Sequence, residues 1–204
     1  MIGKRKSIRI LVFGIIASCL VYAGILRADN SMNDNYILEK TEDFSIVYPL
    51  DWYKETKGEK LMIVGPVLTE EKDRLQRPII TIIKDTDEGA VRNAKGIKEN
   101  YNRWKSLPNI KNKMLEFLLN NLIKEYRDGR HEFISSDYEE NEDFIILHII
   151  DIDKERNVKI YSVNFITKAE PLKSYTIMFI CIKEYFDKYL PIFKRCVDSF
   201  DINK

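Results

Sequence analysis

Hydrophobic positions near the C-terminus follow first the period of a strand and then that of a helix. From Tyr175 to Ile182 both alternating sets of side chains are apolar apart from Thr176. A strand that is apolar on both faces indicates a sheet covered on both sides. Beyond it, apolar residues recur every three or four positions, which predicts an amphipathic helix that Pro191 kinks or restarts. The apolar stripe of this helix consists of Phe186, Tyr189, Leu190, Phe193 and Val197.

The same alternation predicts further strands upstream. Residues 79–83 and 144–153 are also apolar on both faces, and Phe144–Asp153 is the candidate for the central strand. Short turns join successive strands, so the pairing is predicted to be antiparallel. Trp52, which follows the turn at Pro49, is expected to close one end of the core. The other strands are predicted at 36–40, 44–48, 61–68, 130–138 and 158–167, and one helical turn at 69–76.

Two helices are predicted between residues 86 and 130. The first is capped by Thr86 or Asp87 and ends before Pro108. The second runs from about Asn109 to Tyr126, and its apolar arc is wider than one buried face requires. Such a helix is either wedged between other elements or presented to a partner. The apolar face of the first helix is Val91, Ala94, Ile97, Tyr101 and Trp104, and the candidate partner-binding residues of the second are Ile110, Met114, Phe117 and Leu118.

Length and charge narrow the class of protein. A chain of 204 residues with 45% apolar content favours a single α+β core behind a targeting segment. Five of the 33 Lys and Arg residues precede Asp29, which leaves 28 cations against 32 Asp and Glu in the rest of the chain. An acidic remainder disfavours binding to nucleic acid, so no nucleic-acid partner is expected.

The N-terminus has the pattern of a targeting sequence. Four cations up to Arg9 precede an uncharged run from Ile10 to Leu26, which is typical of a signal peptide or of an N-terminal membrane anchor. A third alternative is a lipoprotein, because residues 16–19 resemble a lipobox with Cys19 as the lipidation residue. Each alternative predicts an extracytoplasmic protein, secreted or anchored to the outer face of the cytoplasmic membrane. The predicted parts are a signal peptide or anchor (1–28), a flexible tether (29–35) and one domain (36–204).

Two short motifs resemble the PsbP/DcrB-like family. Residues 44–52, FSIVYPLDW, match a pattern F-x-I-x-Y-P-x-x-W that opens the domain, and the last helix ends on Ser199-Phe200. The resemblance implies an α/β/α sandwich with a central, mainly antiparallel sheet of about six to seven strands. It also implies a non-enzymatic accessory or binding module, because members that look similar include lumenal and envelope proteins. No functional residue of the family can be matched here, and the helical pair at 87–126 is longer than is usual in the family.

Candidate chemistry is sparse. The two histidines are His131 and His148, and the second lies among isoleucines, which favours a buried imidazole with a local hydrogen-bond partner. No local motif of a hydrolase, a phosphate loop or a zinc protease occurs, so neither a catalytic residue nor a cofactor is expected. Cys181 and Cys196 are expected to be buried free thiols, because the helix between them keeps them apart.

Acidic turns leave one metal hypothesis open. Asp151, Asp153 and Glu155 are candidate ligands for a hard cation such as Ca²⁺, although solvated turns are the usual explanation of such clusters. The function predicted is thus a non-enzymatic binding protein at the cell envelope, whose partner is another envelope protein and which meets the membrane through its N-terminal segment. The alternatives are a secreted hydrolase that uses a histidine with nearby acids, and a protein that binds a small ligand or a cation.

Overall fold

The computed structural model describes residues 35–58, 60–71, 74–125 and 129–203. The predicted signal peptide or anchor, the tether up to residue 34 and the lipidation residue Cys19 lie outside these ranges. Within them, no helix is both long enough and apolar enough to cross a bilayer.

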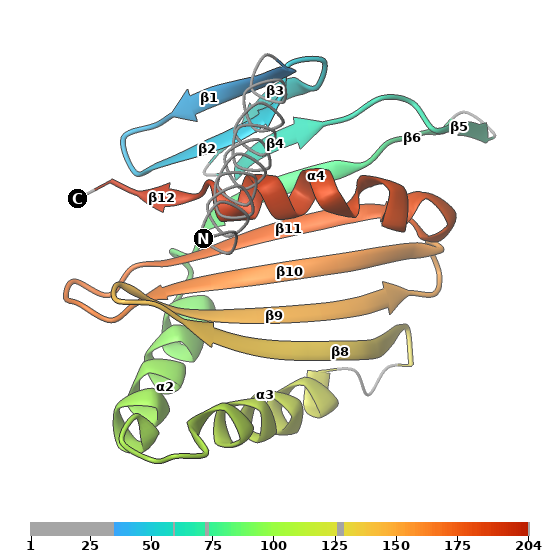
Figure 1. Ribbon diagram of the computed structural model, residues 1–204. Helices are drawn as coiled ribbons and strands as arrows, with labels where there is room; N and C mark the ends of the chain where they lie inside the picture. Colours follow the sequence, from blue (N-terminus) through green and yellow to red (C-terminus); the bar gives the residue numbers. More distant parts are fainter. Residues whose placement is uncertain (1–34, 59, 72–73, 126–128, 204) are drawn as a thin grey trace, which may run out of the picture.

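An antiparallel sheet forms the middle of the molecule (Figure 1). Its strands are β3 (Tyr53–Lys57), β4 (Lys60–Val64), β7 (Ile79–Lys84), β8 (His131–Glu140), β9 (Phe144–Asp153), β10 (Val158–Thr167) and β11 (Ser174–Ile182). The order across this seven-stranded sheet is β3-β4-β7-β11-β10-β9-β8. Strands β8 to β11 form a meander, as the short turns predict, whereas β7 pairs with β11 across a long separation in sequence. The predicted α+β class and antiparallel sheet are confirmed.

The middle strand of this sheet is β11. The prediction that Phe144–Asp153 is the central strand is wrong, because β9 lies next to the edge strand β8. Ile146, His148 and Ile150 on one face of β9 are only half-buried, whereas Ile177 and Phe179 of β11 are fully buried. Alternation shows which faces of a strand are apolar, but the place of a strand in the sheet depends on which distant strand pairs with it.

One face of the sheet carries a front layer. It consists of helix α4 (Phe186–Asp198), the preceding 3₁₀ turn η3 (Lys183–Tyr185) and a small sheet of β1 (Tyr36–Lys40), β2 (Phe44–Pro49) and β12 (Asp201–Ile202). In Figure 1, α4 runs alongside β11. The ring of Phe193 stacks on that of Phe179 with centroids 5.3 Å apart, and Trp52 packs on Tyr189 at 6.0 Å. Trp52 is 4% exposed and belongs to this core, as predicted.

The opposite face carries a back layer of α2 (Glu88–Trp104) and α3 (Ile110–Glu125). Asp87 caps α2, since its Oδ1 accepts a hydrogen bond of 2.9 Å from the backbone N–H of Ala90. Ile145 and Leu147 of β9 pack in the core under these helices, while Ile146 between them packs against the front core. Neighbouring residues of a strand point to opposite faces. The two layers therefore flank the sheet, and the α/β/α order is confirmed.

The back layer covers only part of the sheet. Within the described ranges, the back core includes side chains from β8, β9 and β10 but none from β4, β7 or β11. Met62, Ile83 and Met178 on the back face of those strands are half-buried. The predicted cover of both faces is therefore incomplete on this side. The border of the back layer is where the cleft described below lies.

Several local predictions are corrected. The predicted helical turn at 69–76 is a hairpin of β5 (Thr69–Glu71) and β6 (Arg74–Gln76), and β3 was not predicted. Helix α4 continues through Pro191 without a break. Val91, expected on the buried face of α2, is 42% exposed.

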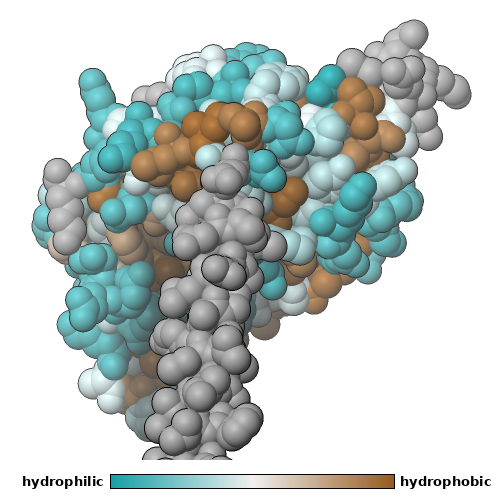
Figure 2. Space-filling model, turned by 45° about the horizontal axis from the view of Figure 1, so that its top comes forward, coloured by the Kyte–Doolittle hydropathy of each residue, from teal (hydrophilic) through white to brown (hydrophobic). Residues whose placement is uncertain are grey.

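Exposed apolar side chains occur on the surface of the small sheet. Leu38 of β1 and Leu50, just after β2, are 52% and 58% exposed. Figure 2 shows apolar residues on this side of the molecule set among hydrophilic ones. Single exposed leucines are common on protein surfaces and do not by themselves mark a binding site.

Candidate functional site

A cleft of about 470 Å³ lies where α2 and α3 meet the back face of the sheet. Strands β9 and β10 form its floor through Leu147, Ile149 and Asn164. A concave, mostly apolar site of this size with a few polar groups is typical of small-ligand binding. The helices line it with Arg92, Asn93, Gly96, Ile97, Phe117, Leu118 and Asn121.

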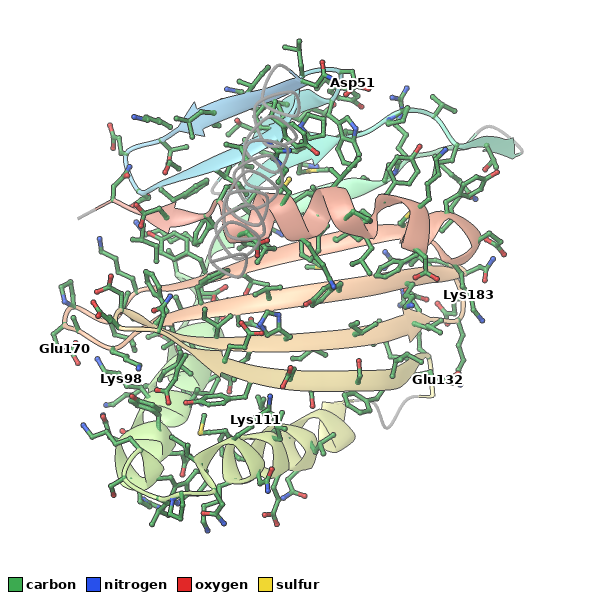
Figure 3. The ribbon with its side chains drawn as sticks, viewed as in Figure 1. Asp51, Lys98, Lys111, Glu132, Glu170 and Lys183 are labelled. Atoms are coloured by element: carbon green, nitrogen blue, oxygen red, sulfur yellow. The ribbon has the colours of Figure 1, made fainter. Side chains whose placement is uncertain are left out.

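Ion pairs hold both helical walls in place. Lys98 of α2 donates to Glu170 Oε1 at 2.8 Å and to the carbonyl oxygen of Ala169 at 3.1 Å, which ties α2 to the turn between β10 and β11. Figure 3 labels Lys98 and Glu170 at this end of the sheet, and Lys111 between α3 and the strands. Lys111 of α3 lies 2.6 Å from Asp137 of β8 and lowers the pKa of that carboxyl through their hydrogen bond. The walls are thus fixed to the sheet and not only to each other.

Gly96 widens the cleft from the α2 side. An alanine Cβ built at this glycine has no heavy atom within 4 Å outside its own helix and neighbours, so the space opposite the residue is open. Gly96 has an ordinary helical backbone, and glycine in the middle of a helix is destabilising relative to alanine. Neither close packing nor a positive φ therefore requires a glycine here, whereas an open cleft is consistent with one.

A polar chain continues from the floor of the cleft across the same face of the sheet. Thr176 Oγ1 donates to Asn164 Oδ1 at 2.9 Å and lies 3.3 Å from both carboxyl oxygens of Asp85. Ser174 Oγ donates to the same carboxyl at 2.6 Å. Burial raises the pKa of Asp85, and the hydrogen bond from Ser174 opposes that shift only in part. With its Oδ1 occupied by Thr176, Asn164 keeps its Nδ2 group available for the cleft.

The predicted partner-binding arc divides between the core and the cleft. Phe117 and Leu118 line the cleft. Met114 is fully buried in the back core and Leu118 is 6% exposed, so these two side chains cannot form an outer docking surface. Ile110 is half-buried against the same core. Binding through Phe117 stays a prediction, and the site for it is a cleft and not an outward face.

The three candidate metal ligands lie against basic side chains and not against one another. Asp151 Oδ1 lies 3.0 Å from His131 Nδ1. Asp153 is paired with Arg130 and Arg156, each at 3.1 Å, and Glu155 with Arg130 at 3.3 Å. In the described part of the chain, no group of three or more His, Cys, Asp and Glu side chains is placed to hold a metal ion. The acids at this end of the sheet are arranged as an ion-pair network.

His148 has the local partner that the sequence suggested. Its Nδ1 lies 2.9 Å from the hydroxyl oxygen of Tyr161, and its Nε2 lies 3.8 Å from Glu139. Burial lowers the pKa of the imidazole, which keeps the ring neutral near neutral pH. Tyr161 in turn packs edge-on against Phe193 of α4 at 5.0 Å. The histidine therefore serves the packing of the front core.

The two thiols of the domain are free and buried, as expected. Cys181 and Cys196 are 1% and 0% exposed, and neither forms a disulfide. Burial raises the pKa of each thiol to about 12. A thiol in this state is a poor nucleophile, because the thiolate is the reactive form.

Sequence reasoning missed most of the polar residues of the cleft. Arg92 and Asn93 lie just outside the predicted apolar face of α2. Asn164 lies on β10, an internal strand of the seven-stranded sheet. Two signals were present in the sequence. Gly96 lies in the middle of a helix, where it neither caps nor kinks the helix, and Asn164 is an amide between two apolar residues of a strand. Neither signal shows that the two segments meet.

The fold is an α+β domain with a helical pair on one side of its sheet and a cleft where that pair meets the sheet. No family model matches the chain, and no curated protein does. Among solved structures, similar folds include a cyanobacterial PsbP from Synechocystis, with 9% identity and a TM-score of 0.41 over 82% of this chain and 91% of that one. LpqN of Mycobacterium tuberculosis, described as involved in cell envelope biogenesis, has 10% identity and a TM-score of 0.47 over 79% and 83%. A variant of the protein Mog1 has 8% identity and a TM-score of 0.43 over 82% and 96%.

A PsbP protein is thus among the structures similar to this chain, and PsbP belongs to the family that the sequence motifs resemble. At such identities the likeness concerns the course of the backbone and gives no information on ligands or partners.

Proposed function

We propose that this chain is a non-enzymatic accessory or binding protein of the cell envelope, and that the cleft between α2, α3 and the sheet is its binding site. One observation carries the proposal. The cleft has about 470 Å³ of space, a floor that is apolar except for Asn164, and walls tied to the sheet by Lys98 and Lys111. Preformed concave sites of this kind lose little free energy to reorganisation when a ligand enters.

The place of action rests on the N-terminal sequence. Cations up to Arg9 followed by the uncharged run from Ile10 to Leu26 support export across, or retention in, the cytoplasmic membrane. The absence of hydrolase and phosphate-loop motifs from the sequence supports a binding role over an enzymatic one. The occupant of the cleft has an apolar group that packs on Phe117 and Leu147, supplied by a small molecule or by an envelope partner.

The test of the site uses a neutral probe and a blocked cleft. The full chain is titrated with 2-naphthamide, and binding is read from the rise in melting temperature, because a ligand that binds only the folded state stabilises it. Gly96→Trp places a large ring in the open space opposite Gly96. Gly96→Ala is the matched control, since its methyl group leaves most of that space open.

We expect wild type and Gly96→Ala to be stabilised alike, and Gly96→Trp to show no stabilisation. If Gly96→Trp itself lowers the melting temperature, Asn93→Trp repeats the block from an exposed position that also lines the cleft. Equal stabilisation of all variants would show that the probe binds elsewhere and that the cleft is not the binding site.

A further inference from the structure

The lining of the cleft is biased in charge. It contains one cation, Arg92, three amides, and no carboxylate. The chain beyond residue 28 has more acids than bases, 32 against 28 by the count above, so a lining without an acid differs from the average composition of the domain. An anionic group that enters the cleft therefore meets donors and no like charge on the surrounding walls.

Arg92 is available for a ligand. Lys98 on the same helix is paired with Glu170, and Lys111 on the facing helix with Asp137. The side chain of Arg92 makes no ion pair or hydrogen bond within the part of the chain that the structure describes. A guanidinium offers two parallel N–H donors that match a carboxylate, and such charge-assisted pairs are about twice as strong as neutral hydrogen bonds.

The floor adds a second donor. Asn164 Oδ1 accepts from Thr176, so its Nδ2 group remains for an acceptor in the cleft. The carboxyl of Asp85 lies on the other side of Thr176 from Asn164 and does not line the cleft. The apolar side chains of Ile97 and Phe117 line the same cleft. Donors and apolar surface in one cleft suit a ligand that has a charged end and an apolar body.

We propose that the cleft binds a small organic monoanion, with its carboxylate on Arg92 and its apolar body on Phe117, Ile97 and Leu147. The inference rests on the proposed function, since it names the class of ligand for the same site. Asn164 contributes a neutral donor at the floor. The recognition is electrostatic at one end and hydrophobic at the other.

The experiment compares two probes of the same shape. The full chain is titrated with 2-naphthoate and with 2-naphthamide, which share a ring system and differ in the negative charge. The variants are Arg92→Gln, Arg92→Lys and, as a control cation on the same helix outside the cleft, Arg103→Gln. Dissociation constants are measured at low and at high salt, because salt weakens interactions between exposed charges.

We expect wild type and Arg103→Gln to bind 2-naphthoate at least about tenfold more tightly than 2-naphthamide at low salt, the effect of a charge-assisted pair worth about 1.4 kcal/mol. In Arg92→Gln this preference falls to about one, with the affinity for 2-naphthamide unchanged. Arg92→Lys keeps a preference of a few-fold, because an ammonium retains the charge but not the forked geometry.

The outcomes separate the two proposals. If 2-naphthamide binds and Gly96→Trp blocks it, but 2-naphthoate binds no more tightly or Arg92→Gln keeps the preference, the monoanion proposal is wrong and the binding cleft stands. If neither probe binds wild type, both proposals are wrong.

Discussion

Two glycines of this chain are predicted to respond to alanine in opposite directions. Gly96 lies inside α2 with open space opposite it, so Gly96→Ala adds a methyl group without a clash and removes the conformational freedom of glycine from the unfolded chain. The gain expected from helix propensity is about 0.5–1 kcal/mol in the free energy of unfolding. For a domain of this size that corresponds to a rise of roughly 1–4 °C in melting temperature.

Alanine at Gly65 is expected to lower the stability, because a side chain there would clash with its neighbours. A Cβ on this residue would lie 2.6 Å from Cγ of Pro78 and 2.9 Å from two ring carbons of Trp52. Gly65 itself is buried, and its N–H donates to the carbonyl oxygen of Pro78 at 2.9 Å, so the backbone has little room to move away. Overpacking of this kind costs about 1–3 kcal/mol. Gly65→Ala is therefore expected to destabilise the domain.

Urea unfolding of the full chain, followed by circular dichroism, measures both effects in one series. The midpoints should shift in opposite directions at an unchanged slope, because a changed slope would mean a changed unfolded state or an intermediate. A loss of stability in Gly96→Ala would mean that the space beside α2 is filled, and the cleft would then be absent. No cost in Gly65→Ala would mean that Trp52 does not pack as described.

Two further predictions concern buried titratable groups. Burial raises the pKa of Asp85, so its protonated form favours folding; that contribution is full below the unfolded value of 3.8 and is lost as pH rises through the higher folded pKa. Asp85→Asn should remove this dependence, so the stability of the variant relative to wild type should increase with pH across that window in thermal melts; a constant difference would contradict the burial of the carboxyl. Cys181 and Cys196, whose pKa values burial raises to about 12, should resist iodoacetamide at pH 8 in the folded chain and react once it is unfolded, as measured by peptide mass spectrometry. Rapid alkylation of either thiol under native conditions would show that the front core opens.

The elements that sequence patterns predicted well are those whose period is long and uninterrupted. Strands β9 and β11 follow from apolar residues on both faces over ten and nine residues, and the stripe of α4 follows from its spacing. The order of the strands in the sheet was harder to predict from the sequence. β7 lies against β11 with Ile82 opposite Ile177, a pairing that no local signal encodes. The strand taken as central consequently lies one place from the edge.

The prediction of short elements was wrong for a different reason. The hairpin of β5 and β6 has three residues in each strand, which is too short for a period of two to be told from one of 3.6. Thr69 was read as a helix cap, but its hydroxyl donates to Gln76 across the hairpin at 3.2 Å. A side chain that caps a helix and one that bridges two strands look the same in sequence.

The wide apolar arc of α3 follows from two different surroundings of one helix. Met114 and Leu118, one turn apart, face the back core, and Met114 is fully buried there. Phe117 lies on the flank of that stripe, packs edge-on against Trp104 of α2 at 6.3 Å and lines the cleft. A single buried face would not need an apolar residue at that flanking position. The sequence left open whether this helix is wedged between elements or faces a partner. Met114 and Leu118 pack in the back core, and Phe117 lies beside the space in which a ligand is proposed to bind.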